Sequence, residues 1–193
     1  MKKLLGEYSY SIVKMLIYQL AIGIFGAMIS MATFAMKNDM LSLVVGVLSV
    51  LFYLFLLYTM TWEIGAKDRI SVDVGKKPYR PYMGFLLSLI ANIPNFVITA
   101  ISLLSIGLYL LGAGEGFYSA FVILNFIFRL FLGPYLGVIQ WMTESFSLSV
   151  EVRYFVDNAL FFVLPTITVL IAHFAFTMGI NEKTIFSTYK KKK

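Results

Sequence analysis

Five long stretches of apolar residues, separated by short polar segments, make up most of this chain. An α-helix needs about 20 residues to cross the hydrocarbon core of a bilayer, and each stretch is at least that long. We therefore predict an all-α integral membrane protein in which residues 1–193 form a single membrane domain, a polytopic helical bundle. The stretches are Ser11–Met36, Met40–Trp62, Met83–Gly112, Phe117–Trp141 and Asn158–Ile180.

The composition agrees with this pattern. Hydrophobic residues make up 60% of the chain and charged residues only 13%, which is too apolar for a water-facing domain. The longest polar segments are too short to bury a core of their own. Any function must therefore be carried by the bundle and its connecting loops.

The positions of the positive charges determine the expected topology, because cytoplasmic loops collect Lys and Arg. Basic residues gather in three places: before or early in the first stretch, in residues 63–82, and in the tail 181–193. If all five stretches crossed with the N-terminus inside, the basic tail would be external. If one stretch enters and returns on the same side, all three groups are cytoplasmic, and only Lys37 and Arg153 lie outside.

We therefore predict a protein of the cell membrane with both termini in the cytoplasm, four stretches that cross fully and one that is broken or re-entrant. Residues 63–82 are then a cytoplasmic loop, 142–157 an external loop and 181–193 a basic cytoplasmic tail. A plain five-span protein with an external tail remains the alternative.

Two stretches could fail to cross. We favour 117–141, because Arg129 lies near its middle and is followed by Gly133-Pro134, where Pro breaks helical hydrogen bonding. Gly137 adds a GxxxG pair with Gly133 that would allow close helix approach. The other choice is 83–112, which contains Pro94 between two asparagines.

The third stretch also carries a polar stripe. Its polar residues follow one another at intervals of three or four positions, so on a helix they share one face. This face should point into the bundle, where it either bonds neighbouring helices or lines a wet cavity. The residues are Ser88, Asn92, Asn95, Thr99 and Ser102.

Arg129 is the most informative single residue, since charges within a membrane segment often mark a binding site or pathway. No Asp or Glu lies inside any apolar stretch, so Arg129 should either extend toward the surface or meet something anionic. Asn125 precedes it by one helical turn. His173, the only histidine, is expected to make an interhelical hydrogen bond, with a proton relay as the other reading. The candidate binding cluster is Asn92, Asn95, Asn125, Arg129 and His173.

The polar segment 63–82 is the candidate docking surface for a membrane or cytoplasmic protein partner. Its alternative role is to face anionic lipid head groups and fix the orientation of the chain. The net charge of +6 lies beside the apolar stretches, which favours the lipid bilayer with anionic head groups as a partner and argues against nucleic acid. The candidate docking residues are Lys67, Arg69, Lys76, Lys77 and Arg80.

The sequence contains no pattern typical of catalysis. There is no cysteine, and no nucleotide-binding loop, metal-binding motif or paired mid-membrane carboxylates. We predict no catalytic residues, no metal and no cofactor, and hence not an enzyme. The overall type is similar to small multi-pass membrane proteins of Gram-positive bacteria, a resemblance of composition that implies no residue roles.

Two functions follow as hypotheses. The first is a non-enzymatic subunit or accessory of a membrane complex, such as one involved in transport, that docks through residues 63–82. The second is a small permease or binding bundle for an anionic or amphiphilic solute, which uses the polar cluster around Arg129.

Overall fold

The computed structural model describes residues 2–36, 38–144, 149–183 and 185. These residues form α-helices and one short 3-10 helix and contain no strand, which confirms the predicted all-α helical bundle. The elements are α1 (Lys2–Ala35), α2 (Asp39–Asp73), α3 (Met83–Leu110), α4 (Glu115–Phe131), η1 (Gly133–Tyr135), α5 (Leu136–Glu144) and α6 (Val150–Ile180).

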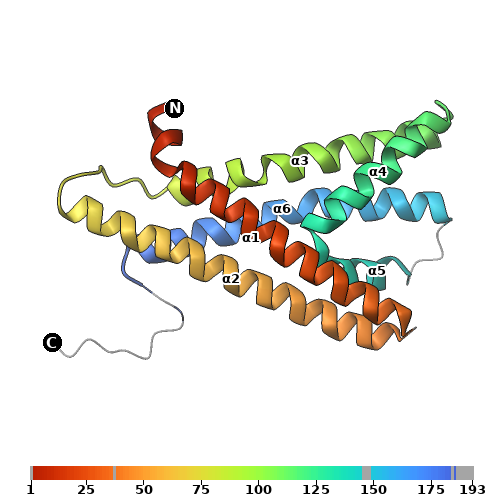
Figure 1. Cartoon of the computed structure of the whole chain (residues 1–193), viewed down its shortest axis with the longest axis horizontal. Coiled ribbons are helices and arrows are strands. Elements are labelled where there is room, and N and C mark those ends of the chain that lie inside the picture. The colour runs from red at the N-terminus through yellow and green to blue at the C-terminus, as the bar shows by residue number, and fades with distance from the viewer. Residues whose placement is uncertain (1, 37, 145–148, 184, 186–193) are drawn as a thin grey trace.

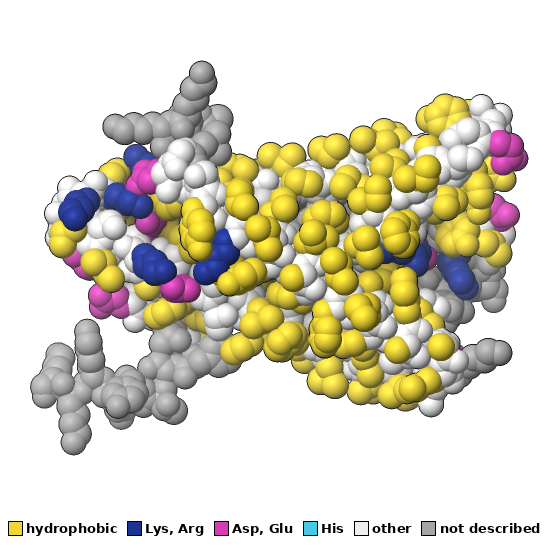
Figure 2. Space-filling view, viewed as in Figure 1, with side chains coloured by type: hydrophobic (Ala, Val, Ile, Leu, Met, Phe, Trp, Pro, Cys, Tyr) yellow, Lys and Arg dark blue, Asp and Glu magenta, His cyan; other side chains and the backbone are white. Residues whose placement is uncertain are grey.

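Four helices, α1, α2, α3 and α6, are long and apolar enough to cross a membrane. They run the length of the molecule in alternating directions (Figure 1). Hydrophobic side chains cover the middle of the face drawn in Figure 2, and charged side chains gather toward the two ends. The molecule therefore has the surface that a multi-pass membrane protein requires.

The start of α1, the α2–α3 loop and the end of α6 lie at the same end of the bundle (Figure 1), here called the basic end. Contacts between distant segments hold them together there. The Lys77 ammonium lies 2.7 Å from the Glu7 carboxylate, and the Trp62 indole donates a hydrogen bond to the carbonyl of Lys183 at 2.6 Å. Lys190–Lys193 of the predicted tail lie outside the described residues.

The fourth apolar stretch does not cross as one helix, as predicted. Helix α4 enters from the opposite end, and the axis bends by 93° at a short break before α5. Figure 1 shows α5 heading back toward the end where α4 began. We call residues 115–144 the re-entrant hairpin and this end of the bundle the hairpin end. Helix α3 is continuous although Pro94 lies inside it, so the alternative that 83–112 bends back is wrong.

The tip of the hairpin packs directly against the backbone of α1. A methyl group added to Gly23 would overlap the carbonyl oxygens of Leu130 and Phe131, and one added to Gly26 would overlap the backbone of Pro134. Gly133 meets α1 from the other side in the same way. Only glycine permits such a close backbone approach.

A second glycine crossing fixes α5 on α2. The backbones of Gly137 and Gly46 are so close that an added methyl on Gly137 would lie 3.1 Å from the Cα of Gly46. Gly133 and Gly137, which the sequence presents as one GxxxG pair, therefore contact two different helices. The hairpin is held between α1 and α2 by these contacts.

Helices extend further into the predicted loops than the sequence suggested. Helix α2 continues through Asp73, so only residues 74–82 of the segment 63–82 form a connector. Two ion pairs at the i,i+4 spacing, Glu63 with Lys67 and Arg69 with Asp73, support the extra turns. In the segment 142–157, residues 142–144 belong to α5 and residues 150–157 to α6, while 145–148 lie outside the described residues.

Single cysteines test the hairpin topology, because the natural chain has none. Ala113→Cys and Ser149→Cys flank the hairpin and are both exposed, and we expect a membrane-impermeant maleimide to label them from the same side of sealed vesicles. Lys76→Cys, in the connector at the basic end, should be labelled only from the other side. A five-span protein would instead expose Ala113→Cys and Ser149→Cys on opposite sides.

Gly23→Ala tests the close packing of the hairpin tip. The added methyl must displace backbone rather than a flexible side chain, so we expect a loss of about 2 kcal/mol or more in stability, measured as a lower Tm in detergent. Gly116→Ala is the matched control, since a Cβ there meets nothing within 4 Å and Ala favours a helix over Gly. Equal melting temperatures for the two variants would contradict the packing.

Candidate functional site

The predicted polar cluster is divided among separate places in the bundle. Asn92 and Asn95 lie inside the bundle on α3, whereas Asn125 and Arg129 belong to α4 of the re-entrant hairpin. His173 lies on α6. The structure brings Asn92 and Asn95 into one hydrogen-bonded group, and Arg129 into another group with residues that the sequence did not indicate.

Arg129 has an acidic partner. Its guanidinium lies 3.7 Å from the carboxylate of Asp157 on α6, whose side chain is only 9% exposed. Arg129 therefore meets a carboxylate that lies outside the apolar stretches. Asp157 immediately precedes the fifth apolar stretch. Because the chain turns back soon after Arg129, this arginine lies at the same level of the bundle as Asp157. Seven residues after the start of α6, Asp157 is about 10 Å along the helix axis, near the hairpin end.

The ion pair lies in a polar pocket of about 190 Å³ between α4, α5 and α6. Its charged groups are two guanidinium ions, from Arg129 and Arg153, and the carboxylate of Asp157. The apolar part of the wall includes Phe161, whose ring centre is 6.0 Å from the Arg129 guanidinium. The pocket therefore combines a net positive charge with a partly apolar wall.

Arg129 is incompletely satisfied by the described residues. A separation of 3.7 Å is an ion pair but too long for a hydrogen bond. The Nε of Arg129 and the Nδ2 of Asn125, one turn earlier on α4, are both buried without a hydrogen-bond partner in the described part of the chain. A guanidinium carries five N–H donors, so Arg129 retains donors that could bind an acceptor in the pocket.

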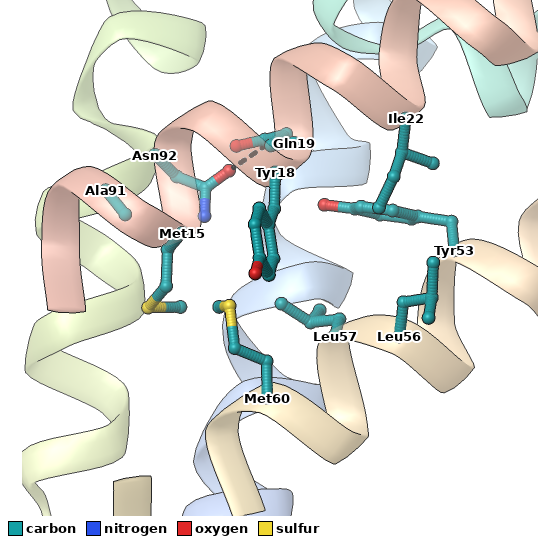
Figure 3. A pocket seen from close by; sticks show the side chains of 10 residues that line it. All are labelled: Met15, Tyr18, Gln19, Ile22, Tyr53, Leu56, Leu57, Met60, Ala91 and Asn92. Carbon is teal, nitrogen blue, oxygen red and sulfur yellow. Dashed lines mark hydrogen bonds between the residues drawn. The ribbon is translucent and has the colours of Figure 1, made fainter. Parts of the chain in front are cut away.

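Asn92 is the centre of a second polar group in the middle of the bundle (Figure 3). Its Oδ1 accepts hydrogen bonds from Gln19 of α1 at 3.2 Å and from Asn95 at 3.1 Å. The Thr168 hydroxyl of α6 lies 3.4 Å from the same oxygen. The Asn92 amide donates to the carbonyl of Ser88. These bonds connect α1, α3 and α6.

The space beside Asn92 is small. The cavity bordered by Gln19, Tyr53 and Asn92 has a volume of about 20 Å³, which is enough for about one water molecule. The polar stripe of α3 faces the bundle as predicted, and all five of its residues are buried. Because the cavity is so small, interhelical bonding describes this group better than a solute path.

His173 does not join either group. Its ring packs edge to face against Phe85 of α3 with the ring centres 6.2 Å apart. Its Nδ1 is buried and has no hydrogen-bond partner among the described residues. The interhelical hydrogen bond expected of this side chain is therefore not formed within the described part of the chain.

At the basic end, three of the five candidate docking residues are held in ion pairs. Lys67 and Arg69 pair with carboxylates on α2, and Lys77 bonds to both Glu7 and Asp68. Lys76 and Arg80 form no ion pair with any of the described residues. These two cations are the ones available to an external partner.

Lys77 forms a network that the sequence analysis missed. The Tyr8 hydroxyl donates to Asp68 at 2.5 Å, and the Lys77 ammonium lies 3.0 Å from the same carboxylate group. Burial by itself would lower the pKa of Lys77, but its hydrogen bonds to Glu7 and Asp68 outweigh this effect and raise the pKa above its usual value. Lys77 thus stays charged, and the network joins the start of α1 to α2.

Among the described residues, no three His, Cys, Asp or Glu side chains come together in a group that could hold a metal ion. Comparison with known proteins finds no relative: no family model, no curated protein and no solved structure matches this chain. The chemistry of the pockets is therefore the basis for any functional conclusion.

Proposed function

We propose that this protein is a non-enzymatic membrane bundle that binds a small anionic solute, one bearing a carboxylate or phosphate group, in the pocket at the hairpin end. One observation carries the proposal: Arg129 has a buried Nε without a partner and borders a pocket that Arg153 also lines. Guanidinium groups bind carboxylates and phosphates through paired hydrogen bonds.

The charges of the pocket support binding of an anion. Two arginines face one carboxylate, so one positive charge is not compensated by the described lining residues. Asp157 balances Arg129 when no ligand is bound, which allows a buried cation to persist in the empty site. A volume of about 190 Å³ is below the 300–1,000 Å³ typical of sites for drug-sized ligands, so it suits a small solute.

The floor of the pocket supports binding rather than free passage. Phe161, one turn beyond Asp157 on α6, packs against Phe128 with ring centres 5.1 Å apart. Both rings and the neighbouring Leu132 are almost completely buried. This apolar layer belongs to the packed core, so movement of a solute beyond the pocket would require the hairpin to shift.

We infer that the basic end faces the cytoplasm, because the basic residues of the start of the chain and of the segment 63–82 gather there and cytoplasmic segments collect Lys and Arg. The pocket at the hairpin end would then open toward the exterior. A solute from outside the cell could reach Arg129 without crossing the hydrocarbon core.

Thermal unfolding in an uncharged detergent tests the proposal, with sodium phosphate and sodium acetate compared with sodium chloride at equal ionic strength. We expect one of the two anions to raise the Tm, with a stabilisation of about 2.7 kcal/mol at 100 times its Kd. Arg153→Gln and Arg129→Lys should each weaken this effect. Arg69→Gln, at the basic end, should leave it unchanged.

Loss of folding must be separated from loss of binding. Arg129→Leu alone leaves Asp157 without its cation, whereas Arg129→Leu with Asp157→Leu removes both charges and should fold. We expect the double variant to melt cooperatively and to show no stabilisation by either anion. Equal stabilisation of the double variant and the natural protein, or none in the natural protein with either anion, would refute the proposal.

A second candidate function is an accessory subunit that docks through the connector at the basic end. The favouring observation is that Lys76 and Arg80 have no ion pair among the described residues, unlike the other three candidate docking cations. Lys76 is exposed and Arg80 is partly exposed, and such unpaired cations can attract an acidic partner surface.

Cross-linking in native membranes tests this second function. Lys76→Glu with Arg80→Glu should abolish co-purification of a partner. The control is the exchange Glu63→Lys with Lys67→Glu, which reverses a pair that is already neutral and should have little effect. A protein that purifies alone in every form would count against an accessory role.

A further inference from the structure

Helices α1 and α2 border a lateral groove of about 360 Å³ that the proposed anion site does not use. Its walls are formed from one face of each helix. The main residues are Lys14, Tyr18 and Ile22 from α1, and Leu56, Met60 and Glu63 from α2. We call this the α1–α2 groove.

Charge and apolar surface are separated along the groove. On α1, Lys14, Tyr18 and Ile22 follow at four-residue intervals, so they lie along one helix face. On α2, the apolar Leu56 and Met60 lead to Glu63. The charged residues of both walls are therefore those nearest the basic end, and the rest of the groove is mainly apolar.

The length of the groove matches one half of a bilayer. Lys14 and Ile22 are eight residues apart on α1, or about 12 Å along its axis. One leaflet provides about half of the roughly 30 Å thickness of the hydrocarbon core. An acyl chain with its head group at Lys14 would fit along most of this groove.

The groove also continues into a polar pocket at the basic end. This second pocket, of about 220 Å³, shares Lys14, Met60 and Glu63 with the groove and extends to Asp68 and Lys77. A polar compartment that opens into an apolar one has the shape of an amphiphile's binding site.

Lys14 gives the groove its charge preference. Its ammonium lies 5.3 Å from the centre of the Tyr18 ring, and none of the ion pairs among the described residues includes it. The Glu63 carboxylate is close enough to interact electrostatically with Lys14, but it bonds to Lys67 at 2.6 Å. The other two lysines of the polar pocket, Lys67 and Lys77, are both held in ion pairs with carboxylates.

We propose that the α1–α2 groove binds one anionic phospholipid of the surrounding leaflet, with its phosphate at Lys14 and one acyl chain between Tyr18, Ile22, Leu56 and Met60. A half-buried lysine at the edge of the hydrocarbon region requires an anion, and lipid phosphate is the anion present at that depth. This site is independent of the anion pocket, because the two lie at different ends of the bundle and share no lining residue.

Native mass spectrometry of the delipidated protein tests the inference, with dioleoyl phosphatidylglycerol and dioleoyl phosphatidylcholine added separately. We expect one phosphatidylglycerol to be retained with an affinity about tenfold higher than that of phosphatidylcholine, which corresponds to about 1.4 kcal/mol. Lys14→Gln should remove this difference. Lys76→Gln, a cation of the same end that does not line the groove, should preserve it.

Two further experiments test whether the lipid is bound through an acyl chain in the groove. Ala21→Trp and Thr59→Trp place a ring into the groove from exposed positions, so we expect both variants to fold and to lose the bound lipid. Inorganic phosphate alone should not displace phosphatidylglycerol, since it lacks an acyl chain. Equal retention of the two lipids by the natural protein, full displacement by phosphate, or unchanged retention in both Trp variants would overturn the inference.

Discussion

The close contact between the hairpin tip and α1 is the constraint on which the rest of the hairpin end depends. Glycines at 23, 26 and 133 bring the two backbones together without intervening side chains. This contact makes it feasible for non-helical backbone around η1 to lie inside the bundle, where protein rather than lipid covers it. The position of Arg129, four residues before Gly133, follows from the same contact.

The hairpin also explains how the bundle accommodates a charge. A guanidinium in the middle of a crossing helix would face the full hydrocarbon core. Because α4 ends and the chain turns back, Arg129 instead reaches a depth at which Asp157 of α6 is available. The polar pocket is therefore a consequence of the way the chain turns, and Arg153, Tyr154 and Gln140 become part of it through the packing of α5 and α6.

The interior polar residues divide into two types. Asn92 bonds to its neighbours across three helices and leaves only a cavity of about 20 Å³, so this group stabilises the bundle. Within it, the buried Oδ1 of Asn95 has no hydrogen-bond partner among the described residues. Arg129 and Asn125 retain buried groups without partners among the described residues. An unpaired buried group is costly in a membrane. Arg129 is charged and borders a pocket of about 190 Å³, whereas the cavity at the centre is much smaller, which is the reason for assigning ligand binding to the hairpin end and helix packing to the centre.

The two ends of the molecule also differ in how many of their cations are paired with carboxylates. At the basic end, Glu63, Asp68, Asp73 and Glu7 form ion pairs with three cations, Lys67, Arg69 and Lys77. Lys14 in the groove and Lys76 and Arg80 in the connector have no ion pair among the described residues. At the hairpin end, the described cations of the pocket outnumber its carboxylates. Each proposed partner is therefore matched to a place where the described carboxylates do not balance all of the cations.

The sequence by itself determined the features that depend on local composition. Long apolar stretches indicate membrane helices, the Arg129 and Gly133-Pro134 pattern identified the stretch that turns back, and the intervals of the α3 stripe determined which face is buried. The sequence also contains the i,i+4 pairs Glu63–Lys67 and Arg69–Asp73, which favour a helix that continues beyond the apolar stretch. Such features follow from helical periodicity and the free energy of transfer into lipid, which act on neighbouring residues.

Only the tertiary structure decided which distant residues meet. It paired Arg129 with Asp157, Tyr8 with Asp68, and Gln19 with Asn92, and it kept His173 apart from the other candidates. These contacts depend on the rotation and depth of each helix, which the glycine crossings fix through backbone contact between segments far apart in the chain. A single sequence records the glycines but not the partners that they approach, because their packing is defined only when the helices come together.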